Sequence, residues 1–345
     1  MKKIVIATES WHPMLNGVVK TLDNIIPFLE KNDFDVTIVH PRLFLNVPVF
    51  FYPEFRLALF AKRKIKKMIE EIKPDYIHIE TEDPVGFAMR SVCLKKKLNF
   101  TTAITTNFPE YSEIYFKKWT GFFSPFLLPY TKKCLSWFHR AGSKTMVSTK
   151  TLKKEAESCG LKNVVIRPLG VAPEIFFRKQ ESFATKQYNF KHPVFVFLGR
   201  LAKEKNIEEF LKCDLPGTKL VIGDGPLKKQ FEKKYKDALF VGWKNEKDIA
   251  DYFSACDVFV FPSTTDTFGI AIIEALSCGL PVAAHNVMGP KDIITNGVDG
   301  YLEEDLKQAA IKCLNLSKED CRKKALKFSW DSSAESFINN LVKVK

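Results

Sequence analysis

Residues 2–40 read KKIVIATESWHPMLNGVVKTLDNIIPFLEKNDFDVTIVH, and this stretch decides the fold class. It predicts a β-branched strand over Lys2–Thr8, a loop through Asn16-Gly17, and a second strand over Asp35–His40. Between the strands, apolar residues recur at helical spacing, which predicts an amphipathic helix. A strand, a helix and a strand in this order favour a parallel sheet. Pro27 falls inside the helical stretch and predicts a kinked or shortened helix.

The same alternation of strands and helices fills the rest of the chain. Further strands are predicted at Asp75–Glu80, Thr101–Thr105, Lys144–Ser148, Val164–Arg167, Val194–Leu198, Lys219–Ile222, Leu239–Val241, Val258–Phe261 and Pro281–Ala284. The pattern turns polar and irregular only between about Val171 and Pro193, which indicates a linker. We therefore predict an α/β protein with a first domain over residues 1–172, a linker over 173–192 and a second domain over 193–331. A last helix over residues 332–345 could pack on either domain and is expected on the first.

Length and composition exclude several classes of protein. The 345 residues are 46% apolar and 27% charged, which is typical of a folded globular chain and excludes a largely disordered one. No apolar run reaches the roughly 18 residues that a bilayer-spanning helix needs, and Glu9 follows the first strand too early for a signal peptide. Eight scattered cysteines show neither zinc-site nor redox spacing. We expect a cytoplasmic protein with reduced, buried thiols.

Positive charge is concentrated in the first half of the chain. Residues 1–190 contain 30 Lys and Arg against 18 Asp and Glu, whereas residues 191–345 contain 23 against 22. Arg63–Lys73 has a strongly basic helical pattern, and an aromatic stretch between Tyr115 and Arg140 is bounded by lysines. Aromatic side chains beside lysines are typical of an interfacial anchor on anionic lipid, so peripheral membrane association is predicted. The alternative is a buried aromatic segment with solvated lysines.

Candidate ligand-binding residues follow the strands of the second domain, where open parallel sheets bind ligands. Gly199-Arg200 and Lys205-Asn206 come directly after one strand, and the two cations suit a diphosphate, although a solvated basic turn has the same pattern. Gly223 and Gly225 follow the next strand, where glycine permits a close approach of the backbone to a ligand, or forms only a turn.

The segment of residues 261–281, FPSTTDTFGIAIIEALSCGLP, is the most specific one in the chain. It predicts a strand, a polar loop with Asp266, and a helix from about Phe268 to Gly279 that carries Glu274 within an apolar run. Asp266 and Glu274 are eight residues apart, so at the rise of a helix their offset is about 12 Å, which suits the two ends of a sugar nucleotide. Carboxylates accept hydrogen bonds from vicinal diols, so one would bind the sugar and the other the ribose. A capped surface helix is the alternative.

Taken together, the motifs resemble those of glycosyltransferase family 4, a large retaining family with the GT-B fold, and most of all its α-mannosyltransferases that use nucleotide-diphosphate mannose. The matching motifs span nearly the whole chain in family order: Asn16-Gly17-Val18, Asn107-Phe108-Pro109-Glu110-Tyr111, Gly199-Arg200 with Lys205-Asn206, Gly223-Asp224-Gly225-Pro226, and Asp266 through Glu274 into Gly289-Pro290. The resemblance implies two Rossmann-like domains that face a cleft and close on it, with the donor held mainly by the second domain and the acceptor by the first.

The resemblance also assigns roles to individual residues. Arg200 and Lys205 would bind the donor diphosphate, Glu274 the ribose and Asp266 the transferred sugar, so these four form the predicted catalytic set. The other residues that it places in the site are Gly17, Gly199, Gly223, Gly225, Trp243, Phe268 and Gly269 for the donor, and Thr105, Asn107, Glu110 and Tyr111 for the acceptor. The Gly17 amide would face phosphate at a helix start, and Trp243 would stack on the base or else belong to a core. No metal or cofactor is expected.

Two positions depart from the family pattern. The family usually has Glu at the position of Asp266, although Asp occurs in the branch that shares its Asp-Thr-Phe-Gly run. Similar sequences tend to carry a His where this chain has Thr105, and a threonine donates one hydrogen bond but cannot carry positive charge. His12 and His78 lie near strand ends of the first domain and are interpreted as structural, with compensation for the missing His as the alternative.

The leading prediction is a retaining, metal-independent enzyme that moves a hexose, mannose from GDP-mannose, to a lipid or glycan acceptor at the cytoplasmic membrane face. Its predicted partners are the sugar nucleotide, the acceptor and an anionic membrane surface. A donor with uridine diphosphate is the alternative within the same fold. A basic nucleic-acid-binding protein is the alternative of another class, for which the sequence offers no recognition helix or stacking platform. An inactive partner subunit is a third reading, supported only by Thr105.

Overall fold

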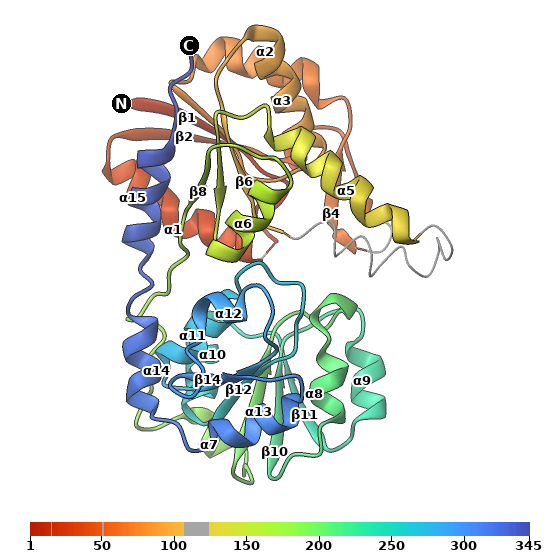
Figure 1. Ribbon diagram of the computed structural model, residues 1–345, viewed down its shortest axis with the longest axis vertical. Helices are drawn as coiled ribbons and strands as arrows, with labels where there is room; N and C mark the ends of the chain where they lie inside the picture. The colour runs from red at the N-terminus through yellow and green to blue at the C-terminus, as the bar shows by residue number, and fades with distance from the viewer. Residues whose placement is uncertain (15, 50–51, 107–123) are drawn as a thin grey trace. The chain divides into compact units, whose positions relative to one another are not determined.

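The computed structural model describes residues 1–14, 16–49, 52–106 and 124–345. The chain forms two compact units (Figure 1): Met1–Leu169 together with Trp330–Lys345, and Gly170–Ser329. Residues 173–192, predicted as a linker, belong to the second unit. There the Ser182 hydroxyl donates a 2.8 Å hydrogen bond to Asp251 Oδ2, and this anchors the start of a short helix on a longer one.

The first unit contains a six-stranded, fully parallel sheet in the order β2-β1-β5-β6-β7-β8. The strands are β1 (Lys2–Ala7), β2 (Phe34–Val39), β5 (Tyr76–Ile79), β6 (Thr101–Ile104), β7 (Lys144–Val147) and β8 (Val164–Ile166). The helices are α1 (Gly17–Lys31), α2 (Ala61–Ile72), α3 (Pro84–Lys96), α5 (Ser124–His139), α6 (Lys150–Ser158) and α15 (Trp330–Asn340), with a one-turn helix η1 (Pro41–Leu43). A separate antiparallel hairpin joins β3 (Asn46–Val49) to β4 (Tyr52–Ala58).

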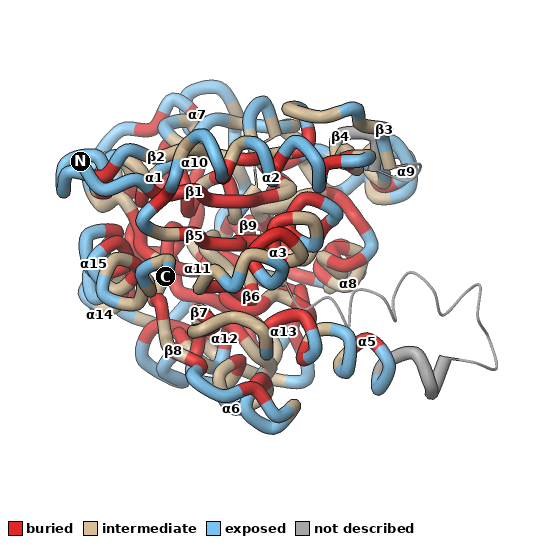
Figure 2. The backbone as a smooth tube through the Cα atoms, turned by 90° about the horizontal axis from the view of Figure 1, so that it is seen from above, coloured by how far each residue is buried: buried red, intermediate tan, exposed pale blue. Residues whose placement is uncertain are grey.

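Alternate side chains of β1 enter two different cores, as the twofold period of a strand requires. Ile4 and Ile6 pack with α1 and α15, whereas Val5 and Ala7 pack with α2 and α3. Both faces of the sheet are therefore covered, and Figure 2 shows the strands as the buried centre of the unit. Because β1 is buried on both faces, it reads as a continuous apolar run.

Helix α1 begins at Gly17, within the loop that the sequence predicts, and Asn16 is its N-cap. The Asn16 side chain accepts hydrogen bonds of 3.0 Å from the amides of Val18 and Val19. Pro27 lies inside the helix, which nevertheless continues to Lys31, so the helix is not shortened.

The second unit repeats the architecture with the strand order β11-β10-β9-β12-β13-β14, again parallel throughout. The strands are β9 (Val194–Leu198), β10 (Thr218–Ile222), β11 (Ala238–Gly242), β12 (Val258–Phe261), β13 (Val282–Ala284) and β14 (Gly300–Leu302). The helices are α7 (Phe183–Gln187), α8 (Ile207–Lys212), α9 (Lys228–Lys234), α10 (Glu246–Ser254), α11 (Ile270–Ser277), α12 (Pro290–Ile293), α13 (Leu306–Cys313) and α14 (Lys318–Ala325), with a one-turn helix η3 (Lys203–Lys205).

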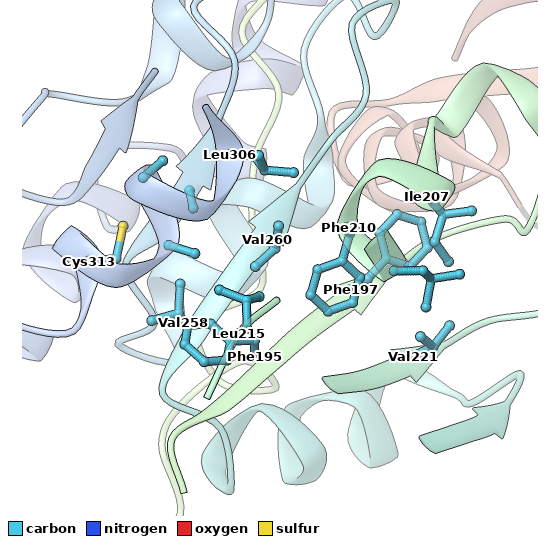
Figure 3. Close-up of a cluster of buried hydrophobic side chains, with 14 of the residues drawn as sticks. Phe195, Phe197, Ile207, Phe210, Leu215, Val221, Val258, Val260, Leu306 and Cys313 are labelled. Carbon is cyan, nitrogen blue, oxygen red and sulfur yellow. The ribbon is translucent and has the colours of Figure 1, made fainter. Parts of the chain in front are cut away.

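Aromatic residues of the central strand fill the core of the second unit. Phe195 and Phe197 of β9 pack against Phe210 of α8, with Val258 of β12 and Leu306 of α13 completing the layer (Figure 3). On the other face of the sheet, Phe253 of α10 meets Phe259 of β12 with ring centroids 5.6 Å apart. The described helices contain none long and apolar enough to cross a membrane.

Candidate functional site

Strands β9 and β12 are neighbours in the sheet of the second unit, with Phe195 paired to Val258 and Phe259 to Val196. The loops that follow them therefore emerge side by side at the carboxyl edge. The first loop carries Gly199–Asn206 and the second carries Pro262–Gly269. This is the edge at which open parallel sheets bind ligands.

Lys205 and Asp266 meet across these two loops. The Lys205 ammonium donates a 2.5 Å hydrogen bond to Asp266 Oδ1, and both side chains are mostly buried. The second carboxylate oxygen of Asp266, Oδ2, is buried and has no hydrogen-bond partner among the described residues. A buried carboxylate oxygen without a donor costs free energy, so this atom is suited to a hydroxyl donor from a ligand.

Hydrogen bonds from side chains to backbone carbonyl oxygens fix the spacing of the two loops. The carbonyl oxygen of Glu204 accepts hydrogen bonds from the hydroxyls of Ser263, at 3.4 Å, and Thr265, at 3.2 Å. The Asn206 amide group donates to the Pro262 carbonyl oxygen at 3.3 Å. The contact of Lys205 with Asp266 is therefore part of a cross-linked pair of loops.

Gly223 and Gly225 allow the loop after β10 to pack closely on the loop after β9. A Cβ at Gly223 would lie 1.9 Å from the Gly199 carbonyl oxygen, and one at Gly225 would lie 2.5 Å from the Leu201 carbonyl oxygen. The Gly199 amide donates to Ile222 and the Leu201 amide donates to Asp224. The backbones of these two loops therefore approach each other as closely as the sequence predicts for a backbone and a ligand. The same hydrogen bonds hold Gly199 and Leu201, the two neighbours of Arg200.

The remaining predicted donor residues take up different environments. Arg200 is half-buried in the loop after β9, and Trp243, directly after β11, is 57% exposed. Phe268 is buried and meets the Phe328 ring edge-on at 5.9 Å, so only its backbone can reach a ligand. Gly269, with φ 92°, is the N-cap of α11.

Glu274 lies on α11 and is only 4% exposed. The helix begins at Ile270, so Asp266 precedes it, and the helical offset expected between the two carboxylates does not apply. The sequence predicts the helix too early because the run from Phe268 to Ile273 is apolar without interruption. The left-handed conformation of Gly269 delays the helix start.

Two residues that the sequence analysis does not single out support the first loop. Glu209 Oε2 accepts a 2.6 Å hydrogen bond from the Asn206 side chain, and the same oxygen lies 3.0 Å from His285 Nε2. His285 follows β13 directly, so its position after a strand of the sheet was the available signal. These two side chains orient Asn206, the neighbour of Lys205.

In the first unit, Gly17 is the exposed first residue of α1, and Thr105 follows β6 and is half-buried. The acceptor residues Asn107, Glu110 and Tyr111 lie outside the described residues. His12 is exposed and lies 2.8 Å from Asp23.

A buried charge network crosses the sheet of the first unit. His78 Nε2 lies 2.8 Å from Glu80 Oε2, and Arg167 donates to both Glu80 oxygens at 2.9 and 2.6 Å. Burial alone would raise the pKa of Glu80, but the charge and hydrogen bonds of Arg167 outweigh it and lower that pKa to about 2. Burial lowers the pKa of His78, which keeps this histidine neutral and structural.

Carboxyl groups gather beyond β1 and β5. Burial, together with the nearby Asp83 and Glu82, raises the pKa of Glu9 to about 8. Burial likewise raises the pKa of Asp83, which caps α3, to about 6. Glu82 Oε1 lies 2.6 Å from His139 Nε2. Among the described residues, no group of three or more His, Cys, Asp or Glu side chains is arranged to hold a metal ion.

Two Rossmann-like parallel-sheet units are the architecture of the GT-B class of glycosyltransferases, to which the structural neighbours of this chain belong. Family comparisons give the same assignment. The model "Glycosyl transferases group 1" matches residues 178–328, and the model "Glycosyltransferase Family 4" matches residues 15–175. Together the matches cover most of both units. The chain belongs to these glycosyltransferase families and is a hexosyltransferase.

Individual relatives agree with this class. A GDP-mannose-dependent alpha-mannosyltransferase of Corynebacterium glutamicum is 24% identical over 87% of this chain and 76% of its own length. Alpha-monoglucosyldiacylglycerol synthase of Acholeplasma laidlawii is 26% identical over 81% of this chain and 79% of its own. Among solved structures, sucrose-phosphate synthase of Thermosynechococcus elongatus has a TM-score of 0.77 at 16% identity over 98% of each chain. HepE of Anabaena, solved with UDP-glucose, has a TM-score of 0.72 at 15% identity, covering 98% of this chain and 99% of that one.

Proposed function

We propose that this enzyme transfers mannose from GDP-mannose, with retention of configuration, to a lipid or glycan acceptor at the cytoplasmic face of a membrane. The observation that carries the proposal is the contact of Lys205 with Asp266 at the carboxyl edge of the second unit. It combines a cation for a diphosphate with a carboxylate whose second oxygen accepts a sugar hydroxyl. The names of the mannosyltransferase relatives from Corynebacterium glutamicum and Mycobacterium tuberculosis support the choice of donor.

The chemistry follows from where charge develops. As the bond between the sugar C1 and the diphosphate oxygen breaks, its electron pair moves to the departing diphosphate, and Arg200 and Lys205 stabilise that negative charge without a metal ion. The acceptor hydroxyl oxygen forms the new bond to C1, and its proton passes to an oxygen of the departing diphosphate. Glu274 binds the ribose, and Asp266 orients the sugar.

A donor with uridine diphosphate is the second candidate. Structural neighbours solved with UDP and UDP-glucose favour it, because their fold covers nearly all of this chain. In both cases Trp243, half-exposed after β11, is proposed to stack on the base.

Thermal-shift measurements with GDP, UDP and ADP, each alone and as its sugar derivative, distinguish these donors. A ligand at 100 times its Kd stabilises the folded protein by about 2.7 kcal/mol, so the correct nucleotide raises the melting temperature by several degrees. GDP-mannose with a lipid acceptor then yields free GDP, and the anomeric coupling of the product, measured by NMR, tests retention. A protein whose melting temperature responds to none of these nucleotides contradicts the proposal.

A further inference from the structure

Helix α2 of the first unit begins with an unfavourable residue. Its N-cap is Phe60, in the left-handed conformation with φ 54° and without a side-chain capping hydrogen bond. The Phe60 side chain is 88% exposed. A β-carbon disfavours this backbone conformation, phenylalanine is a poor N-cap, and the ring gains nothing from burial. An aromatic side chain therefore gains little from the described part of the folded unit at this position.

Two more exposed apolar residues, Leu45 and Val47, lie at the base of the β3–β4 hairpin, which adjoins the start of α2. The Leu59 amide donates a 2.7 Å hydrogen bond to the Leu45 carbonyl oxygen, which brings the base of the β3–β4 hairpin against the start of α2. Leu45, directly before β3, is 69% exposed, and Val47 within β3 is 41% exposed. The Lys64 ammonium donates to the Leu43 carbonyl oxygen at 2.6 Å and holds the two elements together.

The charges of α2 are arranged against its own dipole. The cations are confined to the first two turns and the acids to the last: Lys62, Arg63, Lys64, Lys66 and Lys67 precede Glu70 and Glu71. A helix is stabilised by the opposite order. Ala61, Ile65 and Ile69 face the core, so the cations of the first two turns lie on the opposite, exposed side of the helix. Figure 2 shows exposed residues along this helix. Lys62 and Arg63 have no ion-pair partner among the described residues.

We propose that the α2 edge, formed by Leu45, Val47, Phe60, Lys62 and Arg63, docks on an anionic phospholipid membrane. The inference deepens the proposed function, because it rests on an acceptor presented at a membrane face. Exposed apolar side chains enter the interface while neighbouring cations meet lipid phosphate, which accounts for both unfavourable features of the helix. Residues 115–123 of the aromatic segment lie outside the described residues, and the segment is not needed for this surface.

Co-sedimentation with vesicles tests the α2 edge on the full-length chain. Wild-type protein is expected to bind vesicles of 30% phosphatidylglycerol in phosphatidylcholine, to bind pure phosphatidylcholine weakly, and to dissociate in high salt. Lys62→Glu with Arg63→Glu should lower the partition coefficient at least about tenfold, because each surface cation contributes about fivefold. Phe60→Ala should lower it about fivefold while leaving the melting temperature unchanged or higher.

Matched controls carry the same changes on the second unit. Lys229→Glu with Lys233→Glu alters the net charge equally at exposed positions of α9, and Leu326→Ala removes an exposed leucine. Equal loss of binding in these controls, or unchanged binding in the α2 variants, overturns the proposal. The nucleotide thermal shift is measured in parallel. If the protein binds nucleotide but no vesicle, the docking surface is overturned and the proposed function stands. If it binds vesicles but no nucleotide, the docking surface stands and the proposed function is overturned.

Discussion

At the scale of single residues, the active-site assignment depends on one contact between two side chains to which the sequence gives separate roles. Lys205 was expected at the diphosphate and Asp266 at the sugar, and the structure joins them at 2.5 Å. Under the proposed function, the carboxylate binds the ammonium through one oxygen and a ligand hydroxyl through the other, which is buried. A change to either side chain should affect both ends of the donor.

Lys205→Met should weaken binding of the donor's nucleoside diphosphate about 10- to 100-fold, because a hydrogen bond to a charged group contributes about 1.5–3 kcal/mol. Isothermal titration calorimetry with GDP and UDP measures the change. Lys203→Met is the control, since Lys203 lies in the same turn and is exposed. Equal affinities in Lys205→Met and wild type would remove Lys205 from the diphosphate site.

Glu9 gives the first unit a defined pH dependence. Its pKa is about 8 in the folded protein and near 4.5 when unfolded, so its contribution to stability is complete below pH 4.5 and is lost as the pH rises through 8. Glu9→Gln removes the carboxylate and should raise the melting temperature by several degrees at pH 8.5 but little at pH 5. Calorimetry across this range measures the effect, with Glu30→Gln, an exposed acid on α1, as the control. A parallel shift at both pH values would rule out titration of Glu9.

At the scale of elements, the loops after β9, β10 and β12 form the candidate site by packing on one another. Their glycines are needed at backbone contacts, which is a stronger constraint than flexibility alone. The Lys205 turn and the Asp266 loop are in turn joined through the Glu204 carbonyl oxygen. A residue in one loop is therefore sensitive to the conformation of the next.

Gly223→Ala should destabilise the second unit by about 3 kcal/mol or more, because its Cβ would lie 1.9 Å from the Gly199 carbonyl oxygen and its φ is 140°. Gly297→Ala is the matched control: its φ of 79° is also positive, but its Cβ would meet only the Tyr301 hydroxyl at 3.8 Å. That variant should lose about 1 kcal/mol. Urea unfolding of both variants separates the steric contact from the cost of the backbone conformation. Equal losses in the free energy of unfolding would show that the contact between the loops is unimportant.

At the scale of the whole molecule, the chain leaves its first unit at residue 169 and returns to it at Trp330, after passing through the second unit. Helix α15 follows residue 329 and packs on α1, where Phe337 is fully buried with Ile25 and Met146. The last residues add to the same unit, since the Val344 amide donates to the Asp75 carbonyl oxygen at 2.8 Å. The end of the sequence is thus required for the stability of its beginning.

Phe337→Ala should destabilise the first unit by about 3–5 kcal/mol through the cavity it leaves. Hydrogen exchange followed by mass spectrometry should show faster exchange in β1 and α1 and unchanged exchange in β9 and β10. Leu326→Ala, at a residue 51% exposed, should alter neither unit measurably. Faster exchange throughout both units would show that their stabilities are not separable.

Most of the fold could be predicted because β1, β9 and β12 are buried on both faces and therefore read as uninterrupted apolar runs. The sequence does not predict β14 or the β3–β4 hairpin, since β14 begins at Gly300, a residue type that is disfavoured in strands, and the hairpin alternates poorly around Pro48. The start of α11 was placed too early, because periodicity cannot register the positive φ of Gly269.

The sequence alone determined the class of this enzyme: local alternation of strands and helices requires parallel sheets, and residues directly after strands must lie at one edge. Tertiary structure decided the partners of those residues. The contact of Lys205 with Asp266 and the support from Glu209 and His285 join segments that are distant in sequence. The exposure of Phe60 depends on how the elements pack. Periodicity reports which way a side chain faces along its own element. Only the packing of elements determines what that side chain meets.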